Sequence, residues 1–213
     1  MHIKHLHWIV VEDGNETYPA VENVLKRSKI KYSYLYADTP TEFEKKKSGW
    51  AQRNKALSYI RYHYWRYRRN AVVYFADDDN TYDLRLFNKF IRNVKTVGIW
   101  AVAFVGTALV ETPVVKNGKI QAFNVIFNPS RTFATDMAGF AVNLKLIINS
   151  KASFHHLCKV YDSEDCFLKQ LNITLDKVQP FGVAEHPREV LVWHTQTTHS
   201  GGNGSDYGYN VIA

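Results

Sequence analysis

Short apolar runs and a segment of helical spacing alternate at the start of the chain. Leu6–Val11 is an apolar run that stops at an acidic turn, and Tyr32–Tyr36 is a weaker run that stops at Ala37–Pro40. Between them, the apolar residues of Tyr18–Ser28 recur on one side of a helix. Short apolar runs bounded by turn residues are typical of strands, so the pattern predicts a β-α-β order.

A longer helix and a fully buried strand follow. Apolar positions recur at helical intervals over Trp50–Tyr67, and Ala71–Ala76 is an unbroken run of β-branched and aromatic residues. Such a run is typical of a strand buried on both faces. It ends in three carboxylates, Asp77, Asp78 and Asp79. Ligands of open α/β sheets bind beyond the carboxyl ends of the strands, so this run marks a candidate site.

The rest of the chain continues to alternate, which predicts an α/β fold in one domain over residues 1–199. Asn117–Gly118 is a typical hairpin turn. The Gly- and Ser-rich composition after His199 predicts a flexible tail over residues 200–213. The predicted elements are a helix over Leu84–Val94, a strand over Ile99–Val105, a hairpin over Val114–Phe127, a mostly helical segment over Phe140–Ile148, a helix over Glu164–Leu171 and a strand over Val190–Trp193.

Composition narrows the class of protein. The 213 residues are 46% hydrophobic and 14% aromatic, which is enough apolar surface to form a core. The sequence has no run of about 18 apolar residues of the kind that crosses a membrane. A net charge of +7 indicates an anionic partner, but charge alone does not choose among nucleic acid, a membrane surface and a phosphorylated or carboxylated substrate.

Two further features leave alternatives open. Arginines and aromatic residues interleave over Arg61–Arg69. This pattern fits a nucleic-acid site formed by stacking and charge, but the end of an amphipathic helix with a solvated basic face is the favoured interpretation. Cys158 and Cys166 are the two cysteines of the chain, and they either pair or remain ordinary thiols.

The three adjacent aspartates have a specific chemical consequence. Neighbouring carboxylates repel one another, so a fold that holds Asp77–Asp79 at a strand end favours a cation between them. Carboxylate oxygens suit Mg²⁺ and Mn²⁺, and these ions commonly hold diphosphates with one or two protein carboxylates. The alternative is a solvated turn in which Asp79 or Asn80 caps the next helix.

The carboxylate block resembles that of a known family. Val72–Tyr82 is similar to the metal-binding block of the β-1,3-glucuronyltransferases, glycosyltransferase family 43. Four more blocks resemble the same family in the same order, which extends the resemblance across nearly the whole chain. They are Trp8–Asp13, Gln52–Leu57, Asp136–Val142 and Val190–Thr195.

The resemblance implies a fold, a reaction and partners. It implies a GT-A type nucleotide-sugar transferase fold, with a mixed, mostly parallel sheet flanked by helices and without the first strand of the family. The implied reaction is inverting transfer of glucuronic acid from UDP-glucuronic acid to the 3-hydroxyl of a terminal galactose, on a proteoglycan linker or a glycoprotein, with Mn²⁺ as cofactor. Nucleic acid is not an implied partner. A membrane anchor in the full-length protein, the lumenal side of the Golgi membrane and a homodimer are implied by family membership only.

The same resemblance assigns roles residue by residue. Glu164 is the implied catalytic base, and its neighbour Asp165 cannot face the same hydroxyl because adjacent helical residues point about 100 degrees apart. Asp79 is the implied ligand of Mn²⁺. The implied donor-binding residues are Asp13, Arg53, Asp77, Asp78 and His194, and those implied for acceptor or sugar binding are Glu111, Arg131 and Asp136.

Two departures from the family pattern support a second hypothesis. Gln196 stands where the closing block of the family has arginine, which removes a charge from the diphosphate region. The sequence also starts after the strand and uridine-binding turn with which family catalytic domains begin, so part of the uracil pocket is expected to be missing. The alternative function is therefore a weakly active or inactive relative that binds a nucleotide sugar or a glycan.

Overall fold

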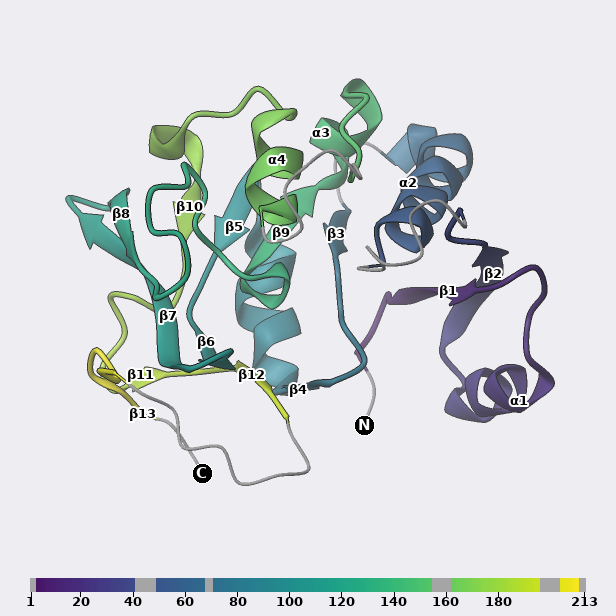
Figure 1. Cartoon of the computed structure of the whole chain (residues 1–213), viewed down its shortest axis with the longest axis horizontal. Helices are drawn as coiled ribbons and strands as arrows, with labels where there is room; N and C mark the ends of the chain where they lie inside the picture. The colour runs from purple at the N-terminus through teal and green to yellow at the C-terminus, as the bar shows by residue number, and fades with distance from the viewer. Residues whose placement is uncertain (1–2, 41–48, 68–70, 155–161, 196–203, 211–213) are drawn as a thin grey trace.

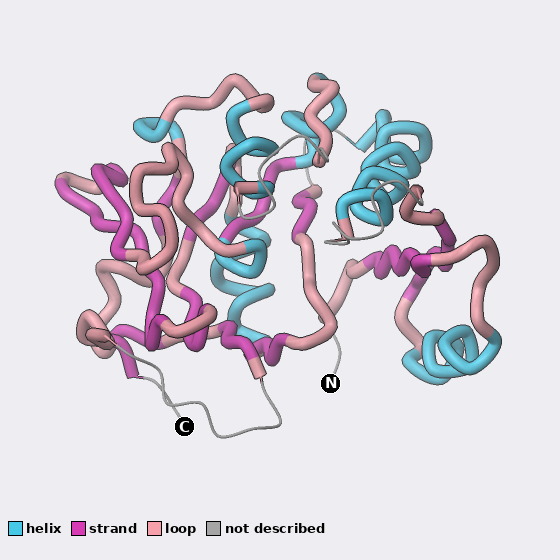
Figure 2. Tube along the Cα trace, in the orientation of Figure 1, coloured by secondary structure: helices cyan, strands magenta, loops and turns pink. Residues whose placement is uncertain are grey.

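The computed structural model describes residues 3–40, 49–67, 71–154, 162–195 and 204–210. Strands and helices alternate along much of the chain, and helices lie beside the sheets in a mixed α/β arrangement (Figures 1 and 2). Within these residues, no helix is both long and apolar enough to cross a lipid bilayer. The predicted α/β class is confirmed at this level.

The chain opens with the predicted β-α-β order. Strands β1 (His7–Asp13) and β2 (Lys31–Ala37) pair in parallel along their whole length, and helix α1 (Pro19–Ser28) connects them. Proline stands at the start of α1, where its missing N–H has no helical partner to lose. The register sets Asp13 opposite Ala37, so the acidic end of β1 lies at the carboxyl end of this pair.

Helix α2 (Trp50–Tyr64) follows, and a 3₁₀ turn over Trp65–Tyr67 continues it. Its Leu57 and Ile60 are buried in the main core. The predicted helix over Trp50–Tyr67 is therefore confirmed.

A four-stranded sheet carries the candidate site on its β3 strand. Its order is β10 (Gln179–Pro180), β5 (Val97–Ile99), β9 (Phe140–Asn143) and β3 (Val72–Tyr74). The prediction of a mostly helical segment over 140–148 is wrong in its first part, because the four buried residues of β9 pair with β5 and β3. Helix α3 (Leu144–Asn149) begins only after Asn143, whose side chain caps it.

A five-stranded sheet forms the other side of the fold. Its order is β4 (Asn80–Tyr82), β12 (Val192–His194), β6 (Val102–Val105), β7 (Ala108–Lys116) and β8 (Lys119–Asn124). The hairpin turn at Asn117–Gly118 is confirmed, and both residues have the positive φ that this turn needs.

Three other predictions need correction. The strand over Ile99–Val105 is split between β5 and β6, which belong to different sheets. The segment predicted as a helix over Leu84–Val94 is helical, but it is π-helical over Leu86–Phe90 and 3₁₀-helical over Ile91–Asn93 instead of regular α-helix. Among the described strands, five pairs are antiparallel and four are parallel, so the expectation of mostly parallel pairing is wrong.

Two residues in the predicted tail form a strand. Strand β13 (Tyr209–Asn210) pairs with β11 (Arg188–Glu189). Tyr209 is buried, and its hydroxyl lies 3.0 Å from Oγ1 of Thr112. The prediction of a flexible tail is therefore wrong for these two residues.

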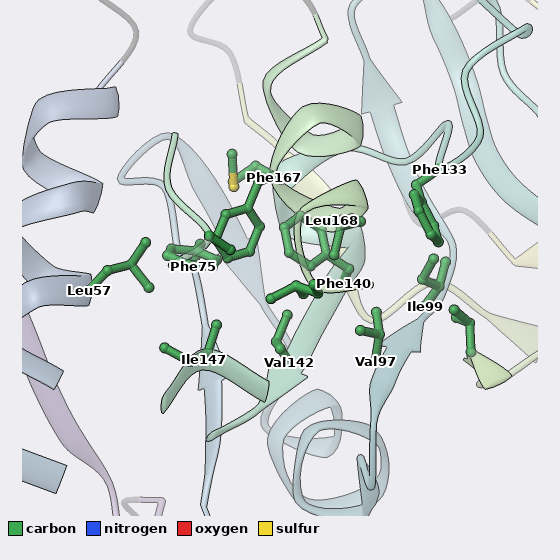
Figure 3. Close-up of a cluster of buried hydrophobic side chains, with 14 of the residues drawn as sticks. Leu57, Phe75, Val97, Ile99, Phe133, Phe140, Val142, Ile147, Phe167 and Leu168 are labelled. Carbon is green, nitrogen blue, oxygen red and sulfur yellow. The ribbon is translucent and has the colours of Figure 1, made fainter. Parts of the chain in front are cut away.

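Aromatic packing joins Phe75, the residue directly after β3, to the short helix α4 (Ser163–Lys169) (Figure 3). The rings of Phe154 and Phe167 stack at 4.4 Å, and the ring of Phe75 meets both edge-on. Phe75 is buried, whereas Ala76 is exposed. The chain thus leaves the core immediately before Asp77.

Candidate active site

The carboxylate run connects β3 to β4 at the surface. Asp77 is half-buried, while Asp78 and Asp79 are exposed. The backbone carbonyl of Asp79 accepts hydrogen bonds from the N–H of Thr195 at 2.9 Å and from its hydroxyl at 2.7 Å. The backbone of Asp79 is therefore fixed against the end of β12, and its exposed carboxylate remains open to a ligand.

Arg53 comes from the first turn of α2 and meets this run. Its Nη2 lies 2.6 Å from Oδ1 of Asp77, and its guanidinium lies 5.7 Å from the centre of the Phe154 ring. Gly49 precedes the helix with φ of 68°, and a Cβ there would lie 3.2 Å from Nη1 of Arg53. Glycine thus permits both the turn into α2 and the close approach of this guanidinium.

Asp13 lies at the edge of the site. Its Oδ1 accepts hydrogen bonds from the backbone N–H and the hydroxyl of Thr39, both at 3.1 Å, and from Nε2 of Gln52 at 2.8 Å. Gln52 also donates to the carbonyl of Ala37 at 2.8 Å. Asp13 therefore joins the ends of β1 and β2 to the start of α2, next to Arg53 along the helix.

His194 and Asp136 form a hydrogen-bonded pair at the other side of the run. Nε2 of His194 lies 3.1 Å from Oδ1 of Asp136, and the same oxygen caps a 3₁₀ turn by accepting from the N–H of Ala138 at 2.9 Å. Burial acts to lower the pKa of His194, but the hydrogen bond and charge of Asp136, with the charges of Asp79 and Asp77, raise it overall. The surroundings of His194 therefore favour its protonated form more than water does.

Glu164, in the first turn of α4, has an environment unlike that of an ordinary surface glutamate. Its side chain is 15% exposed. Burial raises the pKa of Glu164 to about 7, and the charge of Asp136 adds to this rise. Hydrogen bonds from its own N–H and from Ser163, and the charge of Arg131, oppose the rise. A carboxyl group with this pKa is suited to proton transfer near neutral pH.

Arg131 is the cation beside Glu164. Its side chain is 6% exposed, and Nη1 lies 3.9 Å from Oε2 of Glu164. Its Nε lies 3.9 Å from Oδ1 of Asp162 and donates to the carbonyl of Asn128 at 3.3 Å. Nη2 donates to the carbonyl of Phe127 at 3.2 Å. The loop that carries Arg131 thus holds the guanidinium in place.

Glu111 completes this group from strand β7. It is buried, and it lines a small cavity with Asp136 and Trp100. Burial, with the charges of Asp136 and Glu164, raises the pKa of Glu111 to about 7, against the lowering effects of Arg131 and of a backbone hydrogen bond from Ile126. Glu111, Asp136 and Glu164 therefore act on one another electrostatically around a single arginine.

The two adjacent acids at the start of α4 have different roles. Oδ1 of Asp165 accepts from the backbone N–H of Phe133 at 2.8 Å, and its Oδ2 pairs with Nζ of Lys169 at 2.6 Å. Asp165 is buried. Its carboxylate anchors a loop, which agrees with the prediction that Asp165 and Glu164 do not face the same hydroxyl.

Sequence reasoning missed one aromatic residue at the site. Phe127 is 48% exposed, and the guanidinium of Arg131 lies 5.7 Å from the centre of its ring. An isolated aromatic residue in a loop carries no periodic signal. The basic residue four positions later was its one sequence cue. Exposed aromatic rings beside polar groups are common contact surfaces for sugars and other amphipathic ligands.

The donor chemistry of the carboxylate run fits a divalent cation. In the described part of the chain, no three His, Cys, Asp or Glu side chains converge into a metal-binding group. Mg²⁺ and Mn²⁺ need only one or two protein carboxylates where a diphosphate supplies further oxygens. The exposed carboxylates of Asp78 and Asp79 meet that lesser requirement.

The predicted site residues thus form two neighbouring groups. One contains Arg53 and the carboxylate run, and the other contains Glu111, Arg131 and Glu164. The His194–Asp136 pair interacts with both groups. The charges of Asp77 and Asp79 raise the pKa of His194, and the charge of Asp136 raises the pKa of Glu164. Gln196 and Cys158 lie outside the described residues.

The family model of glycosyltransferase family 43 matches residues 1–198. The chain belongs to glycosyltransferase family 43. The resemblance inferred from the ordered sequence blocks is therefore confirmed.

Curated family 43 relatives share a name that states a reaction. The chain is 42% identical over 206 residues to galactosylgalactosylxylosylprotein 3-beta-glucuronosyltransferase sqv-8 of Caenorhabditis elegans, covering 92% of this chain and 57% of that protein. It is 38% identical over 209 residues to the human enzyme 1 of that name, covering 92% and 61% respectively. Enzyme I of Drosophila melanogaster is 38% identical over 211 residues, covering 92% and 68%. The chain therefore spans about three fifths of the nematode and human proteins.

Proposed function

We propose that this chain transfers glucuronic acid from UDP-glucuronic acid to the 3-hydroxyl of a terminal galactose, with inversion and with Mn²⁺ as cofactor. The names of the family 43 relatives support a glucuronosyl reaction on a galactosylgalactosylxylosylprotein. The observation that carries the proposal is Glu164, a largely buried carboxyl group with a pKa raised to about 7 beside Arg131.

Glu164 would act as the base. Inversion in one displacement needs a group that takes the proton of the acceptor hydroxyl on the face opposite the departing UDP. As the hydroxyl oxygen bonds to the anomeric carbon, the bond from that carbon to UDP breaks and the proton passes to the Glu164 carboxylate. A pKa near 7 makes this carboxylate a stronger base than ordinary glutamate, while a large fraction stays ionised at neutral pH.

The residues around the carboxylate run would hold the diphosphate. Mn²⁺ bound at Asp79 would offset the negative charge that develops on the leaving UDP. Arg53, oriented by Asp77, and His194 in its protonated form would supply two further positive groups in the same region. Fixed cations stabilise a developing anion because they need no reorganisation during the reaction. Asp13 and Asp78 would contact the uridine and the ribose.

The second group of residues would bind the sugars. Arg131 would face the carboxylate of glucuronic acid, since a guanidinium matches a carboxylate with two parallel hydrogen bonds. Glu111 and Asp136 would accept hydrogen bonds from sugar hydroxyls. Phe127 would stack on the acceptor, because its exposed ring adjoins the guanidinium of Arg131.

The cellular setting belongs to the same proposal. A proteoglycan linker or glycoprotein acceptor would be modified in the lumen of the Golgi, by a protein anchored in its membrane and assembled as a homodimer. These features are proposed from family membership.

Turnover of UDP-glucuronic acid with a galactosyl-β-1,3-galactose acceptor, with and without Mn²⁺, tests the proposal. The parent chain should release UDP and form the β-1,3-linked product in the presence of Mn²⁺. Glu164→Gln should lower kcat by about 10²- to 10⁴-fold while keeping affinity for UDP. Glu22→Gln on α1 is the matched control and should leave kcat unchanged. A parent chain that binds UDP with Mn²⁺ but forms no product would refute the enzyme hypothesis in favour of a binding relative.

A further inference from the structure

The last turn of α2 forms an open groove that the proposed reaction does not use. The groove has a volume of about 720 Å³. Two of its side chains are large exposed aromatics, since Tyr62 is 78% exposed and Trp65 is 49% exposed. The helix α2, whose end carries these residues, lies beside α3 (Figure 1), and Arg61 donates to the carbonyl of Ile147 in α3. The lining residues of the groove are Arg61, Tyr62, His63, Trp65 and Arg66.

The aromatic rings of the groove lie close to one another and to a guanidinium. The guanidinium of Arg66 lies 4.9 Å from the centre of the Trp65 ring. The ring of His63 lies 4.1 Å from that of Tyr59 and 4.8 Å from that of Tyr62. Flat rings held beside a guanidinium can contact the face of a ligand while the cation pairs with its charge.

Arg61 gives the groove a fixed positive charge. Its Nε donates to the carbonyl of Ile147 at 3.1 Å, and its Nη2 donates to the carbonyl of Ala152 at 2.6 Å. Carbonyl partners hold the guanidinium without neutralising its charge. An anion that enters the groove therefore meets a cation that is already positioned.

The lining of the groove carries positive charge without acidic groups. Arg61 and Arg66 are two of the five lining residues, and none of the five is an aspartate or glutamate. Basic residues without interspersed acids raise the local concentration of anionic ligands. The groove is thus complementary to a polyanion.

We propose that this groove binds a polyanionic glycan, one that bears sulfate or carboxylate groups, at a site separate from the donor site. Sugar rings would stack on Tyr62 and Trp65 while anionic groups pair with Arg61 and Arg66. The lining has no aliphatic side chain that would enter a lipid layer. The choice of a glycan over an oligonucleotide rests on the proposed function. Arg53 and Arg66 are thirteen residues apart, about 20 Å along a helix, so a glycan in the groove leaves the donor site open.

Calorimetric titration with a heparin-derived hexasaccharide at low salt tests this proposal. The double variant Tyr62→Ala/Arg66→Gln should bind about tenfold more weakly than the parent chain. Tyr18→Ala/Arg27→Gln removes one exposed aromatic ring and one charge from the region of α1, so this matched control should retain the parent affinity. Binding should weaken as salt increases, and saturating UDP should not displace the hexasaccharide. Thermal melting checks that each variant folds.

Other results would overturn the inference. Equal hexasaccharide affinity of the parent and of Tyr62→Ala/Arg66→Gln would refute the proposed site. Equal affinity for neutral maltohexaose would show that charge plays no part in the binding. Tighter binding of phosphatidylserine vesicles or of an oligonucleotide, with the same loss in the groove variant, would assign the groove to another class of ligand.

The inference and the proposed function can fail separately. Turnover of a disaccharide acceptor should be unchanged in Tyr62→Ala/Arg66→Gln. Hexasaccharide binding at the groove of a chain that shows no turnover would support the groove and refute the enzyme proposal. Normal turnover, together with equal hexasaccharide affinity in the parent and in Tyr62→Ala/Arg66→Gln, would support the enzyme proposal and refute the groove.

Discussion

Nε2 of His194 lies 3.1 Å from Oδ1 of Asp136. This contact joins the end of strand β12 to the 3₁₀ turn that precedes β9, so it links the two larger sheets at the candidate site. It also places a titratable imidazole between the carboxylate run and the group around Glu164. The pKa of His194 therefore depends on whether these parts of the site are brought together.

Asp136→Asn should lower the pKa of His194. Asp136 raises that pKa through a hydrogen bond and through its charge, against the effect of burial, and an amide keeps the shape but removes the charge. Titration of the imidazole by NMR measures the change. Asp176→Asn, at a fully exposed position, should leave the pKa of His194 as in the parent. An unchanged pKa in Asp136→Asn would contradict the pairing.

Glu111→Gln should reduce the loss of folding stability that the parent chain shows as the pH rises. Burial first, then the charge of Asp136, raises the pKa of Glu111 from 4.5 to about 7. A raised folded pKa contributes stability that is complete below the unfolded value and is lost as pH rises through the folded value. The shift corresponds to at most about 3 kcal/mol.

Thermal melting at pH 5 and pH 8 tests this dependence. The melting temperature of Glu111→Gln should match the parent at pH 5 and exceed it by several degrees at pH 8. Glu22→Gln, which removes an exposed carboxylate on α1, should show no such difference. A variant that melts below the parent at pH 8 would mean that the charged form of Glu111 stabilises the fold.

The position of the carboxylate run followed from local sequence, whereas the pairing around it did not. An unbroken apolar run ending in three acids predicts a strand buried on both faces, followed by its acids. The strand β3 and the acids after it are present, but β3 is an edge strand whose residues are only partly buried, and in this run Phe75 alone is buried. Phe140–Asn143 is an equally apolar run for which periodicity does not distinguish a helix from a strand. Its pairing with β5 and β3 decides the outcome.

The contacts that give the site its chemistry join distant parts of the chain. Arg53 and Asp77 are 24 residues apart, and His194 and Asp136 are 58 apart. No local pattern encodes such distances. The role of Glu164 came from family resemblance, and its raised pKa depends on burial and on Asp136 in the folded chain.

Asp165→Asn and Glu164→Gln should have opposite effects on stability and turnover. Asp165 accepts from the N–H of Phe133 and pairs with Lys169, so its amide variant loses a buried charged hydrogen bond, which costs roughly 1.5–3 kcal/mol. Thermal melting should show a lower melting temperature for Asp165→Asn, and kcat measured below that temperature should approach the parent value. Glu164→Gln should melt no lower than the parent and lose turnover. Loss of turnover in a folded Asp165→Asn would contradict the assignment of Asp165 to a structural role.

Asp79→Asn should weaken the binding of Mn²⁺ together with UDP. Its backbone carbonyl is held by Thr195, so the exposed side chain can change without displacing β4. An amide oxygen carries no charge, and we expect the affinity for UDP in the presence of Mn²⁺ to fall at least about tenfold. Calorimetric titration with UDP, with and without Mn²⁺, separates the metal from the nucleotide. Asp176→Asn is the control. Equal affinities in Asp79→Asn and the parent would remove Asp79 from the metal site.

Phe127→Ala should raise the KM for the galactosyl acceptor and leave the KM for UDP-glucuronic acid unchanged. The exposed ring of Phe127 adjoins Arg131, which lies 3.9 Å from the proposed base Glu164. Loss of one aromatic contact should raise the acceptor KM about three- to tenfold. Steady-state kinetics with each substrate varied in turn measures the two constants. Phe127→Tyr should keep the parent value because it retains the ring, and Tyr18→Ala should do so because its ring lies outside the site. An increase in the donor KM alone would place Phe127 beside the nucleotide sugar instead of the acceptor.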